Sequence, residues 1–385
     1  MKTKMKIVVV TNILTPYRMR FYGEMHKQLV EKGGDFKVFV MTKELPLRPW
    51  NYDSLQDSFT ELLPGQKIMY HGQDELFNFS INKRLKKFAP DIVIIAGSWT
   101  YATSWQMLMN KLKGTQYFFW SESHTVRATQ AASKTGFWAW LKRFFYMRCD
   151  GFCVPGKYAT ETLNGIVGDH GKRVRLPNLV DNEYYSEAIV LRKNKSTLRS
   201  FYKLPLDKRV FITPARLITI KGIDTFLKQI ADNEHKHNSV FVLAGEGPLE
   251  QPICEFAKEN KVDVRLLGYC DQKIVRDLYA AADFFLLPSL QDHNPLTVIE
   301  GSFSGLPLCV STYVGNSPEL VIDKVNGVVY DTINKESVNA AFDFVMSASD
   351  EWIAEAGKKA HEVAAENFNC NDETAKLLNF FESMV

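Results

Sequence analysis

The chain has 385 residues, of which 45% are hydrophobic and 24% are charged, and its formal net charge is +3. This length exceeds what one hydrophobic core usually serves, so two domains are expected, and the composition is that of a soluble globular protein. No apolar run reaches the roughly 18 residues that span a bilayer, and the N-terminal run IVVV is too short for the apolar region of a signal peptide. We therefore expect a cytoplasmic protein.

Short apolar runs alternate with helical patterns through the first half of the chain. The runs are unbroken stretches of Val, Ile and Phe, which is typical of strands covered on both faces of a parallel sheet. Residues 45–80 are less regular and predict a hairpin or a long loop. The predicted strands span 6–12, 36–42, 91–97, 116–123 and 150–156, with an amphipathic helix over 21–33.

The pattern breaks around residues 176–195, which predict a linker followed by a helix, and a second alternating set then begins. Two such arrays predict an α/β fold of two doubly wound Rossmann-like domains that face each other across a cleft. The expected domains are residues 1–178, residues 179–365, and a C-terminal helix over 366–385 that packs back toward the first domain. The second set of strands spans 210–216, 239–245, 264–269, 283–289, 306–312 and 326–331.

The cysteines and histidines show no pattern of a metal site. Cys149 and Cys153 lie near each other, but no second pair of the six cysteines has zinc-site spacing, and no HExxH motif occurs. We expect reduced core cysteines, no metal and no other cofactor.

The charge is unevenly distributed between the two halves. Residues 1–180 contain 26 Lys and Arg against 14 Asp and Glu, whereas residues 181–385 contain 21 against 30. Such asymmetry indicates that the first half faces an anionic partner. Nucleic acid, an anionic membrane and a phosphate-bearing substrate all fit at this point, as does uneven surface charge without a role.

Residues 286–307, LLPSLQDHNPLTVIEGSFSGLP, combine a buried strand, a short loop and a helix that ends at Gly305. Asn294 is a favoured N-cap, and Pro295 suits the first helical turn. Asp292 precedes this helix and Glu300 lies about a turn and a half inside it. Either these are an ordinary loop acid and a solvated helix residue, or both point at a ligand beyond the carboxyl end of the strand.

Other strand ends of the second half carry groups that suit a phosphate ligand. The free amides of Leu296 and Thr297 and the dipole of their helix favour an anion. Arg216 and Lys221 follow an earlier strand and supply the cations that a pyrophosphate needs. The turns at Gly245-Glu246 and Gly268-Tyr269 let a ligand approach the backbone.

These motifs, in this order, resemble the retaining glycosyltransferases of family 4, which have the GT-B fold. The resemblance is carried by ARLITIKGID, LAGEGPL, LLGYCD, LPSLQDHNPLTVIEGSFSGLPLCVS and NGVVYD. The family signature is a Glu, seven residues and a second Glu. Asp292 stands at the first position and Glu300 at the second, so one carboxylate arm is a methylene shorter.

The resemblance implies transfer of a sugar from a nucleotide-sugar donor, with UDP favoured and GDP as the alternative, to an acceptor hydroxyl. The donor is expected in the C-terminal domain and the acceptor in the N-terminal domain, without a metal. The implied donor residues are Arg216 and Lys221 on the pyrophosphate, Asp292 on the donor sugar, Glu300 on the ribose, Leu296 and Thr297 on the distal phosphate, Gly268-Tyr269 against the base, and Asn294, Gly245 and Glu246 around them.

The N-terminal half departs further from the family and resembles some bacterial polysaccharide and lipopolysaccharide enzymes in its segment TNILTPYRMRFY, residues 11–22. Pro16, Tyr17 and Arg18 of this segment are expected at the cleft. The segment WSESHTVR offers further acceptor-side groups, Glu122 and Arg127, together with His124, which the resemblance places near the reacting sugar.

Residues 136–149, GFWAWLKRFFYMRC, combine aromatic side chains with Lys142, Arg143 and Arg148. The spacing predicts one helical face formed by Phe137, Leu141 and Phe144-Phe145. A basic amphipathic helix can lie in a membrane interface, and the same rings can instead pack in the core of the domain.

The chain is thus expected to be a glycosyltransferase of surface-glycan synthesis. The partners are a saccharide or lipid-linked acceptor and an anionic membrane surface, not nucleic acid. Two alternatives remain at this point. A nucleotide-sugar epimerase shares the same two-domain plan, and a catalytically silent nucleotide-sugar-binding subunit is conceivable because Asp292 replaces a glutamate.

Overall fold

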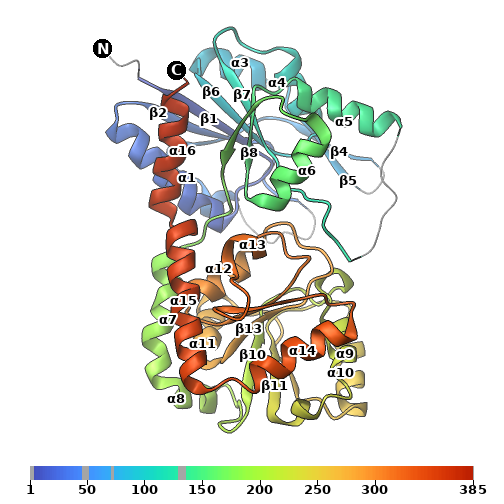
Figure 1. Ribbon diagram of the computed structural model, residues 1–385. Helices are drawn as coiled ribbons and strands as arrows, with labels where there is room; N and C mark the ends of the chain where they lie inside the picture. The colour runs from blue at the N-terminus through green and yellow to red at the C-terminus, as the bar shows by residue number, and fades with distance from the viewer. Residues whose placement is uncertain (1–3, 46–51, 71–72, 129–135, 385) are drawn as a thin grey trace.

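The computed structural model describes residues 4–45, 52–70, 73–128 and 136–384, which form two lobes stacked end to end (Figure 1). Each lobe has a central parallel sheet with helices on both faces. In the described residues the first sheet has the strand order β3-β2-β1-β6-β7-β8-β9. Its strands are β1 (Lys6–Thr11), β2 (Asp35–Val40), β3 (Thr60–Leu62), β6 (Ile92–Ala96), β7 (Gln116–Trp120), β8 (Gly151–Val154) and β9 (Lys172–Arg175).

The second sheet has the order β12-β11-β10-β13-β14-β15, and all of its neighbouring strands are parallel. Its strands are β10 (Arg209–Thr213), β11 (Ser239–Leu243), β12 (Val264–Leu266), β13 (Phe284–Leu287), β14 (Leu308–Ser311) and β15 (Gly327–Tyr330). A separate antiparallel hairpin joins β4 (Gln66–Tyr70) to β5 (Gln73–Phe77).

Helices cover the sheets and connect the lobes. The first lobe holds α1 (Pro16–Glu31), α2 (Tyr52–Leu55), α3 (Ile81–Phe88), α4 (Ala102–Met109), α5 (Phe137–Met147) and α6 (Lys157–Val167). The second holds α7 (Asn182–Leu191), α8 (Lys195–Phe201), α9 (Ile223–Gln229), α10 (Glu250–Glu259), α11 (Gln272–Ala281), α12 (Leu296–Phe303), α13 (Ser317–Leu320), α14 (Lys335–Met346) and α15 (Asp350–Phe368), and α16 (Cys370–Glu382) ends the described chain. Short 3-10 helices span η1 (Arg192–Asn194), η2 (Thr219–Lys221) and η3 (Glu234–Asn238).

The central strands are apolar throughout because both of their faces are buried. Along β1, Ile7 and Val9 pack into one core cluster, whereas Val8 and Val10 pack into another on the opposite face. Successive side chains of a strand point to opposite faces, so an unbroken apolar run needs cover on both. The predicted fold class, two doubly wound α/β domains, is confirmed.

Every strand predicted from an apolar run contains an observed strand, and the strands that sequence patterns missed have identifiable reasons. The short edge strand β9 reads KRVR, a charged run without an apolar pattern. Residues 45–80 hold β3 and the hairpin of β4 and β5, and of this stretch 46–51 and 71–72 lie outside the described residues. In the described part of the chain no helix is long and apolar enough to cross a membrane.

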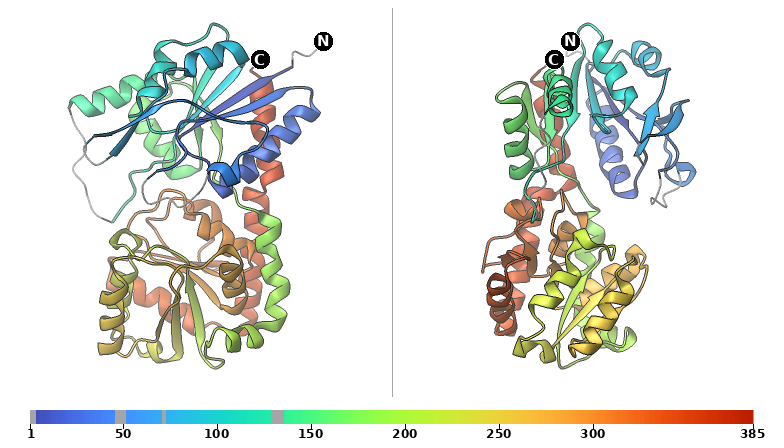
Figure 2. Two further views of the ribbon diagram at one scale, coloured as in Figure 1. Left: turned by 180° about the vertical axis from the view of Figure 1, so that it is seen from behind. Right: turned by 90° about the vertical axis from the view of Figure 1, so that its right-hand side faces the viewer.

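The last helix crosses from the second lobe to the first. Figure 2 shows α15 and α16, in red, running along one side of both lobes. The Phe381 ring of α16 meets Phe118 of β7 edge-on at 5.0 Å, and Lys32 Nζ lies 2.8 Å from Glu382 Oε1. The C-terminal helix is therefore part of the core of the N-terminal lobe.

The predicted apolar face of α5 is partly wrong, because Phe145 does not share the face of Phe137 and Phe144. Phe145 is buried together with Tyr146, whereas Phe137 and Phe144 are exposed. The helix turns by about 100° per residue, so neighbouring Phe144 and Phe145 point in different directions and only one of them reaches the core.

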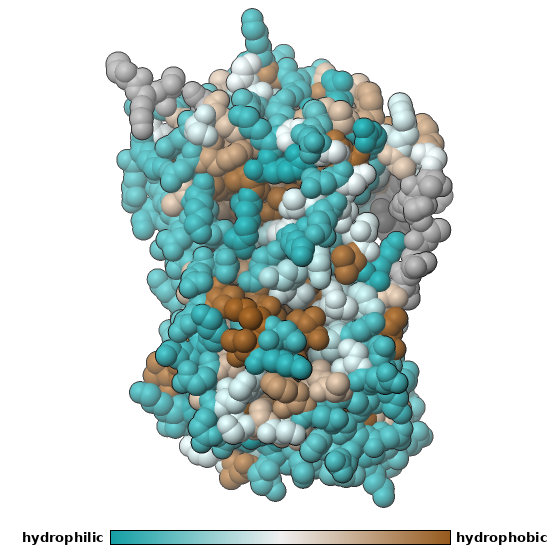
Figure 3. All heavy atoms as spheres, viewed as in Figure 1, coloured by the Kyte–Doolittle hydropathy of each residue, from teal (hydrophilic) through white to brown (hydrophobic). Residues whose placement is uncertain are grey.

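The face of the molecule that Figure 3 shows is mostly hydrophilic. Figure 3 shows hydrophilic side chains over most of the face seen in Figure 1, with hydrophobic side chains gathered at the waist between the two lobes. Loops of both lobes meet at this waist: Ala128 N donates to Leu290 O at 2.9 Å, and Lys157 N donates to Glu319 Oε1 at 2.7 Å. The candidate site residues lie on loops and helices of both lobes, and His124 and Asp292 lie in the loops that make the first of these contacts.

Candidate active site

Each sheet has a topological switch point, at which the chain stops adding strands on one side of a central strand and continues on its other side. In the second sheet β10 pairs with β11 on one side and with β13 on the other. The chain runs from β10 through β11 to β12 and then returns to the other side of β10 as β13. The loops after β10 and β13 therefore diverge, and such a crevice at the carboxyl ends is where open α/β sheets bind ligands.

Three neighbouring turns of the second lobe converge at this edge. Leu217 N donates to Glu246 O at 2.9 Å, and Tyr269 N donates to Glu246 Oε1 at 3.2 Å. Gly245 also forms a bridge with Gly268. A Cβ at Gly245 would overlap the carbonyl oxygen of Ala215, so only glycine permits this approach. The predicted residues Gly245, Glu246, Gly268 and Tyr269 thus lie together beside the loop that carries Arg216.

Lys221 and Asp292 flank the switch point from its two sides. Lys221 ends η2 after β10, and its ammonium forms an ion pair with Asp292 of the loop after β13. The two side chains are 18% and 15% exposed, so the pair is largely removed from water. Ser289 Oγ lies 3.4 Å from the same carboxylate oxygen. The structure therefore brings these two predicted site residues into direct contact.

Gly222 lets the loop after β10 lie close to the loop after β13. Its φ is +64°, in the left-handed region that favours glycine, and a Cβ there would overlap the carbonyl oxygen of Pro288. Leu290 N donates to Ile220 O at 2.9 Å across the same gap. Arg216, by contrast, is exposed, and its guanidinium makes no ion pair or hydrogen bond with another described residue.

The helix after Asp292 begins one residue later than predicted. The N-cap position is held by Pro295, with an extended ψ of 126°, so the expected capping role of Asn294 is wrong. A proline can take this flanking place because its fixed φ suits an extended conformation as well as a helix. The Asn294 side chain is buried, and neither of its amide atoms has a partner within the described residues. The amides of Leu296 and Thr297 stand at the open helix start, where no intrahelical acceptor exists.

Glu300 projects from α12 toward two tyrosines of neighbouring helices. Tyr279 Oη donates to Glu300 Oε2 at 3.0 Å, and Tyr185 also hydrogen-bonds this carboxyl. Burial raises the pKa of Glu300 to about 7, and the two tyrosine hydrogen bonds oppose the rise. Glu300 is therefore partly protonated near neutral pH in the free protein, and it does not touch the Lys221–Asp292 pair directly.

His124 of the first lobe reaches the loop that carries Asp292. Its Nε2 lies 2.9 Å from Asp292 O, and since a carbonyl only accepts, this nitrogen carries the proton. The His124 backbone N–H donates to His293 Nδ1 at 3.3 Å. Burial lowers the pKa of both imidazoles, so both are neutral at pH 7. His124 therefore sits at the junction of the lobes, 4% exposed, and holds the Asp292 loop.

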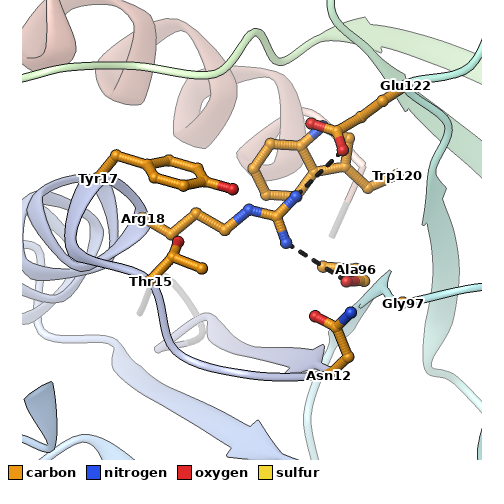
Figure 4. A pocket seen from close by; sticks show the side chains of 8 residues that line it. All are labelled: Asn12, Thr15, Tyr17, Arg18, Ala96, Gly97, Trp120 and Glu122. Carbon is orange, nitrogen blue, oxygen red and sulfur yellow. Dashed lines mark hydrogen bonds and ion pairs between the residues drawn. The ribbon is translucent and has the colours of Figure 1, made fainter. Parts of the chain in front are cut away.

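The first lobe has a cavity of about 140 Å³ at its own switch point, where β1 pairs with β2 and with β6 (Figure 4). The lining residues come from the segments after β1, β6 and β7, so three strand ends contribute. The predicted residues Tyr17, Arg18 and Glu122 line it, while Pro16 opens α1 and Arg127 lies further along the β7 loop, and neither of these two is a lining residue. The complete lining is Asn12, Thr15, Tyr17, Arg18, Ala96, Gly97, Trp120 and Glu122.

Arg18 is held at the wall of this cavity by several contacts. Its Nη2 lies 3.2 Å from Glu122 Oε2, its Nη1 donates to Ala96 O at 3.4 Å, and its guanidinium carbon stands 4.5 Å from the Trp120 ring centre. Three buried polar atoms around it have no partner within the described residues: Thr15 Oγ1, Trp120 Nε1 and Glu122 Oε1. Buried polar groups are normally paired, so unpaired ones beside a cavity point to a ligand or water there.

Sequence reasoning missed the partners that orient the site residues. Tyr185 and Tyr279 come from separate helices and carried no pattern that linked them to Glu300. Trp120 could have been found, because it lies inside the predicted strand 116–123, two residues before Glu122. In the described part of the chain, no three His, Cys, Asp or Glu side chains lie together in an arrangement that could hold a metal ion.

This arrangement defines the GT-B class, in which two Rossmann-like domains meet through their loops and carry polar sites at the ends of their strands. Solved structures share this arrangement. Sucrose-phosphate synthase from Thermosynechococcus elongatus matches with a TM-score of 0.73 at 16% identity and covers 99% of both chains. Anabaena HepE in complex with UDP and glucose matches with a TM-score of 0.71 at 14% identity, over 98% of this chain and 100% of that chain. At these identities the likeness concerns the fold alone.

Comparison of amino-acid sequences gives a more specific similarity than the fold does. Residues 194–363 match the family described as "Glycosyl transferases group 1". The chain is 26% identical over 364 residues to the Escherichia coli UDP-Gal:alpha-D-GlcNAc-diphosphoundecaprenol alpha-1,3-galactosyltransferase, covering 91% of this chain and 90% of that protein. A Campylobacter jejuni alpha-1,4-N-acetyl-D-galactosaminyltransferase is 27% identical over 265 residues, 68% of this chain and 67% of its own length. The second half of the chain thus matches the group 1 glycosyltransferase family, and the resemblance to family 4 is confirmed.

Proposed function

We propose that this glycosyltransferase is a retaining, metal-independent hexosyltransferase. It moves a sugar from a nucleotide-sugar donor, with UDP favoured, to a saccharide or lipid-linked saccharide in surface-glycan synthesis. The observation that carries the proposal is the Lys221–Asp292 pair at the switch point of the second sheet. It supplies a cation for a diphosphate and a carboxylate for sugar hydroxyls at one place.

The donor is proposed to lie across the three converging turns of the second lobe and the loop that carries Asp292. Lys221 and the uncommitted guanidinium of Arg216 neutralise the diphosphate, and the amides of Leu296 and Thr297 bind its distal phosphate. In the ionised form Glu300 accepts from the ribose. Asp292 accepts from the donor sugar, and its pairing with Lys221 supports the view that the arm shortened by a methylene still reaches the site.

The choice of donor and acceptor draws on the relatives. The Escherichia coli protein is named for UDP-Gal and a diphosphoundecaprenol acceptor, and the Campylobacter jejuni protein is named for an undecaprenol-linked acceptor. The Anabaena structure contains UDP. We propose the same classes here, with the acceptor reached at the cytoplasmic face of a membrane.

The acceptor is proposed to bind in the cavity beside Arg18. The unpartnered Thr15 hydroxyl, Trp120 N–H and Glu122 oxygen provide both donors and acceptors, which suits sugar hydroxyls. The ring of Tyr17, which lines the cavity, gives an apolar face for the sugar ring (Figure 4).

In the proposed reaction the bond between the anomeric carbon and the diphosphate oxygen breaks while the acceptor oxygen attacks on the same face. The acceptor proton passes to the departing phosphate oxygen, so no separate protein base is needed. Negative charge grows on the diphosphate, and a preorganised cation aimed at it lowers the barrier by about 3–4 kcal/mol.

The test is calorimetric titration with UDP- and GDP-linked sugars, followed by product analysis with a lipid-linked saccharide acceptor. Donor-dependent formation of a glycoside with unchanged anomeric configuration is expected. Conversion of the donor sugar without an acceptor would establish an epimerase instead. Binding without turnover would establish a silent subunit, and an inverted product would overturn the retaining assignment.

A further inference from the structure

Helix α5 carries large apolar side chains on the side that faces away from its own core. Phe137, Trp140, Phe144 and Met147 are 65%, 57%, 37% and 40% exposed. Their spacing, i, i+3, i+7 and i+10, places them on one helical face. We refer to these four residues as the α5 stripe.

The stripe is a continuous surface because its rings stack on one another. Phe137 stacks on Trp140 at 5.9 Å between centroids, and Trp140 stacks on Phe144 at 5.6 Å. Phe144 in turn stacks on Trp105 of α4 at 6.1 Å, and exposed Met109 follows one turn later on that helix. The apolar surface therefore extends over two neighbouring helices.

The opposite side of α5 already packs in the core of the N-terminal lobe. Phe145 and Tyr146 are fully buried in the cluster that includes Phe119 and Cys149. A helix that is apolar on all sides is normally buried on all sides. Within the described residues, packing leaves more than a third of each stripe side chain exposed, so the stripe is open to a partner.

The charged residues of the segment that carries the stripe are all positive. Residues 136–149 contain Lys142, Arg143 and Arg148 and no acidic residue. Arg143 donates to Ile166 O, and Arg148 donates to Leu108 O at 3.2 Å; neither has a carboxylate partner within the described residues. Their charge is therefore available to an anionic partner.

The position of α5 leaves the stripe accessible to a large partner. Figures 1 and 2 both show α5 projecting from the edge of the N-terminal lobe. A second copy of this chain is a poor fit, because a symmetric contact through the stripe would bring Arg143 and Lys142 against themselves.

We propose that the α5 stripe inserts into the interface of an anionic membrane. Exposed aromatic rings flanked by cations are the composition of helices that lie in the headgroup region, where the rings enter the acyl boundary and the cations meet anionic lipid. This binding goes beyond sugar transfer and does not require it, because it is measured without a nucleotide sugar.

The test is sedimentation of the full chain with vesicles of phosphatidylcholine containing about one-third phosphatidylglycerol. The triple variant Phe137→Ser/Trp140→Ser/Phe144→Ser is expected to lower the partition coefficient by about a hundredfold or more. The variant Lys142→Gln/Arg143→Gln keeps the rings and is expected to lower it by about fivefold for each charge removed. Wild-type binding to pure phosphatidylcholine should be correspondingly weaker.

The matched control is Phe201→Ser/Leu206→Ser, which removes two side chains that are 76% and 62% exposed in the second lobe. Its vesicle binding should equal that of the wild type. The proposal is overturned if the wild type stays in the supernatant with anionic vesicles, or if the charge variant and a folded triple variant both bind as the wild type does. It is also overturned if the stripe instead forms a dimer in solution that the triple variant dissociates, with no vesicle binding.

Discussion

His124 Nε2 lies 2.9 Å from the carbonyl oxygen of Asp292, and this hydrogen bond joins the two lobes at the loop that carries the proposed sugar-binding acid. Gly315 makes the contact possible. A Cβ at Gly315 would overlap His293 O and lie 2.7 Å from His124 Nε2. The Asp292 loop is thus held from the first lobe and from the end of β14 at once, which fixes the reach of its carboxylate.

Replacing Gly315 with Ala should therefore disturb both stability and activity. The added methyl group has no space and must push the His293 segment away, which typically costs about 1–3 kcal/mol. Denaturant unfolding and steady-state kinetics would measure the two effects. Gly165→Ala is the control, since a Cβ there meets nothing within 4 Å and α6 gains helix propensity, so its stability should be unchanged or slightly higher. Wild-type behaviour of Gly315→Ala would contradict the close packing.

Lys221→Ala should lower kcat/KM at least a hundredfold while the fold survives, and Arg216→Ala should act in the same direction. Each removes a cation proposed to stabilise the departing diphosphate, an effect of about 3–4 kcal/mol. Lys228→Ala is the matched control, because Lys228 is an exposed lysine of α9 that pairs with Asp224 at 3.2 Å. Near-normal rates for Lys221→Ala would refute the diphosphate assignment.

Glu300→Gln should make stability less dependent on pH. The wild-type pKa is about 7 in the folded state against an ordinary value near 4.5. Below pH 4.5 both states hold the proton; between 4.5 and 7 only the folded state does, so wild-type stability falls by up to about 3 kcal/mol as pH rises through this window. The variant should match the wild type near pH 4.5 and exceed it near pH 8.

The same substitution should weaken donor binding, because the proposed bond to the ribose needs a carboxylate. In the wild type, donor affinity should accordingly rise as pH increases through about 7. Denaturation at several pH values and calorimetry would test both parts. Parallel stability curves for the two proteins would show that the carboxyl is not perturbed in the fold.

Arg18→Lys should raise the acceptor KM at least tenfold and leave donor affinity within about twofold. A lysine cannot keep the contacts to Glu122 and Ala96 O together with the stacking on Trp120, and a lost hydrogen bond to a charged group is worth about 1.5–3 kcal/mol. Arg20→Lys on the same helix is the control. A change in donor affinity with an unchanged acceptor KM would place the donor, not the acceptor, in this cavity.

Chelator treatment should leave the transfer rate unchanged. The proposed mechanism neutralises the diphosphate with Lys221 and Arg216, so the reaction needs no divalent ion. Rates measured with EDTA and after addition of magnesium would check this. A strict magnesium requirement would contradict the role given to the two cations.

Much of the fold could be predicted because both sheets are built from strands buried on two faces. Short runs of β-branched residues such as KIVVV favour a strand that is covered on both faces, and glycine turns mark the ends of several of them. The strand β9 could not be predicted, because its KRVR sequence has no apolar pattern. It is a strand only because it pairs with β8 at the edge of the sheet. The face of α5 was partly wrong, because its apolar residues occupy every side and the pattern alone does not say which side meets the core.

The sequence predicted which segments form the candidate site, but it did not predict which of their side chains contact one another. Parallel topology alone places Arg216, Lys221, Glu246, Tyr269 and Asp292 at one sheet edge. The pairing of Lys221 with Asp292, however, depends on Gly222 and its close approach to Pro288. The capping role of Asn294 failed because Pro295 itself takes the position before the helix, which sequence preferences for the two residues do not decide.

The path of the C-terminal helices has a consequence for how the enzyme can move. The chain passes between the lobes at the linker before α7 and again at Asn369, where extended backbone separates α15 from α16. Any opening or closing of the two lobes must bend the chain at both crossings at once. The lobes are therefore restricted to rotation about the line that joins the two crossings. Deleting α16 would remove one of the two pivots and uncover the Phe118 ring, so the C-terminus is a poor place for a truncation.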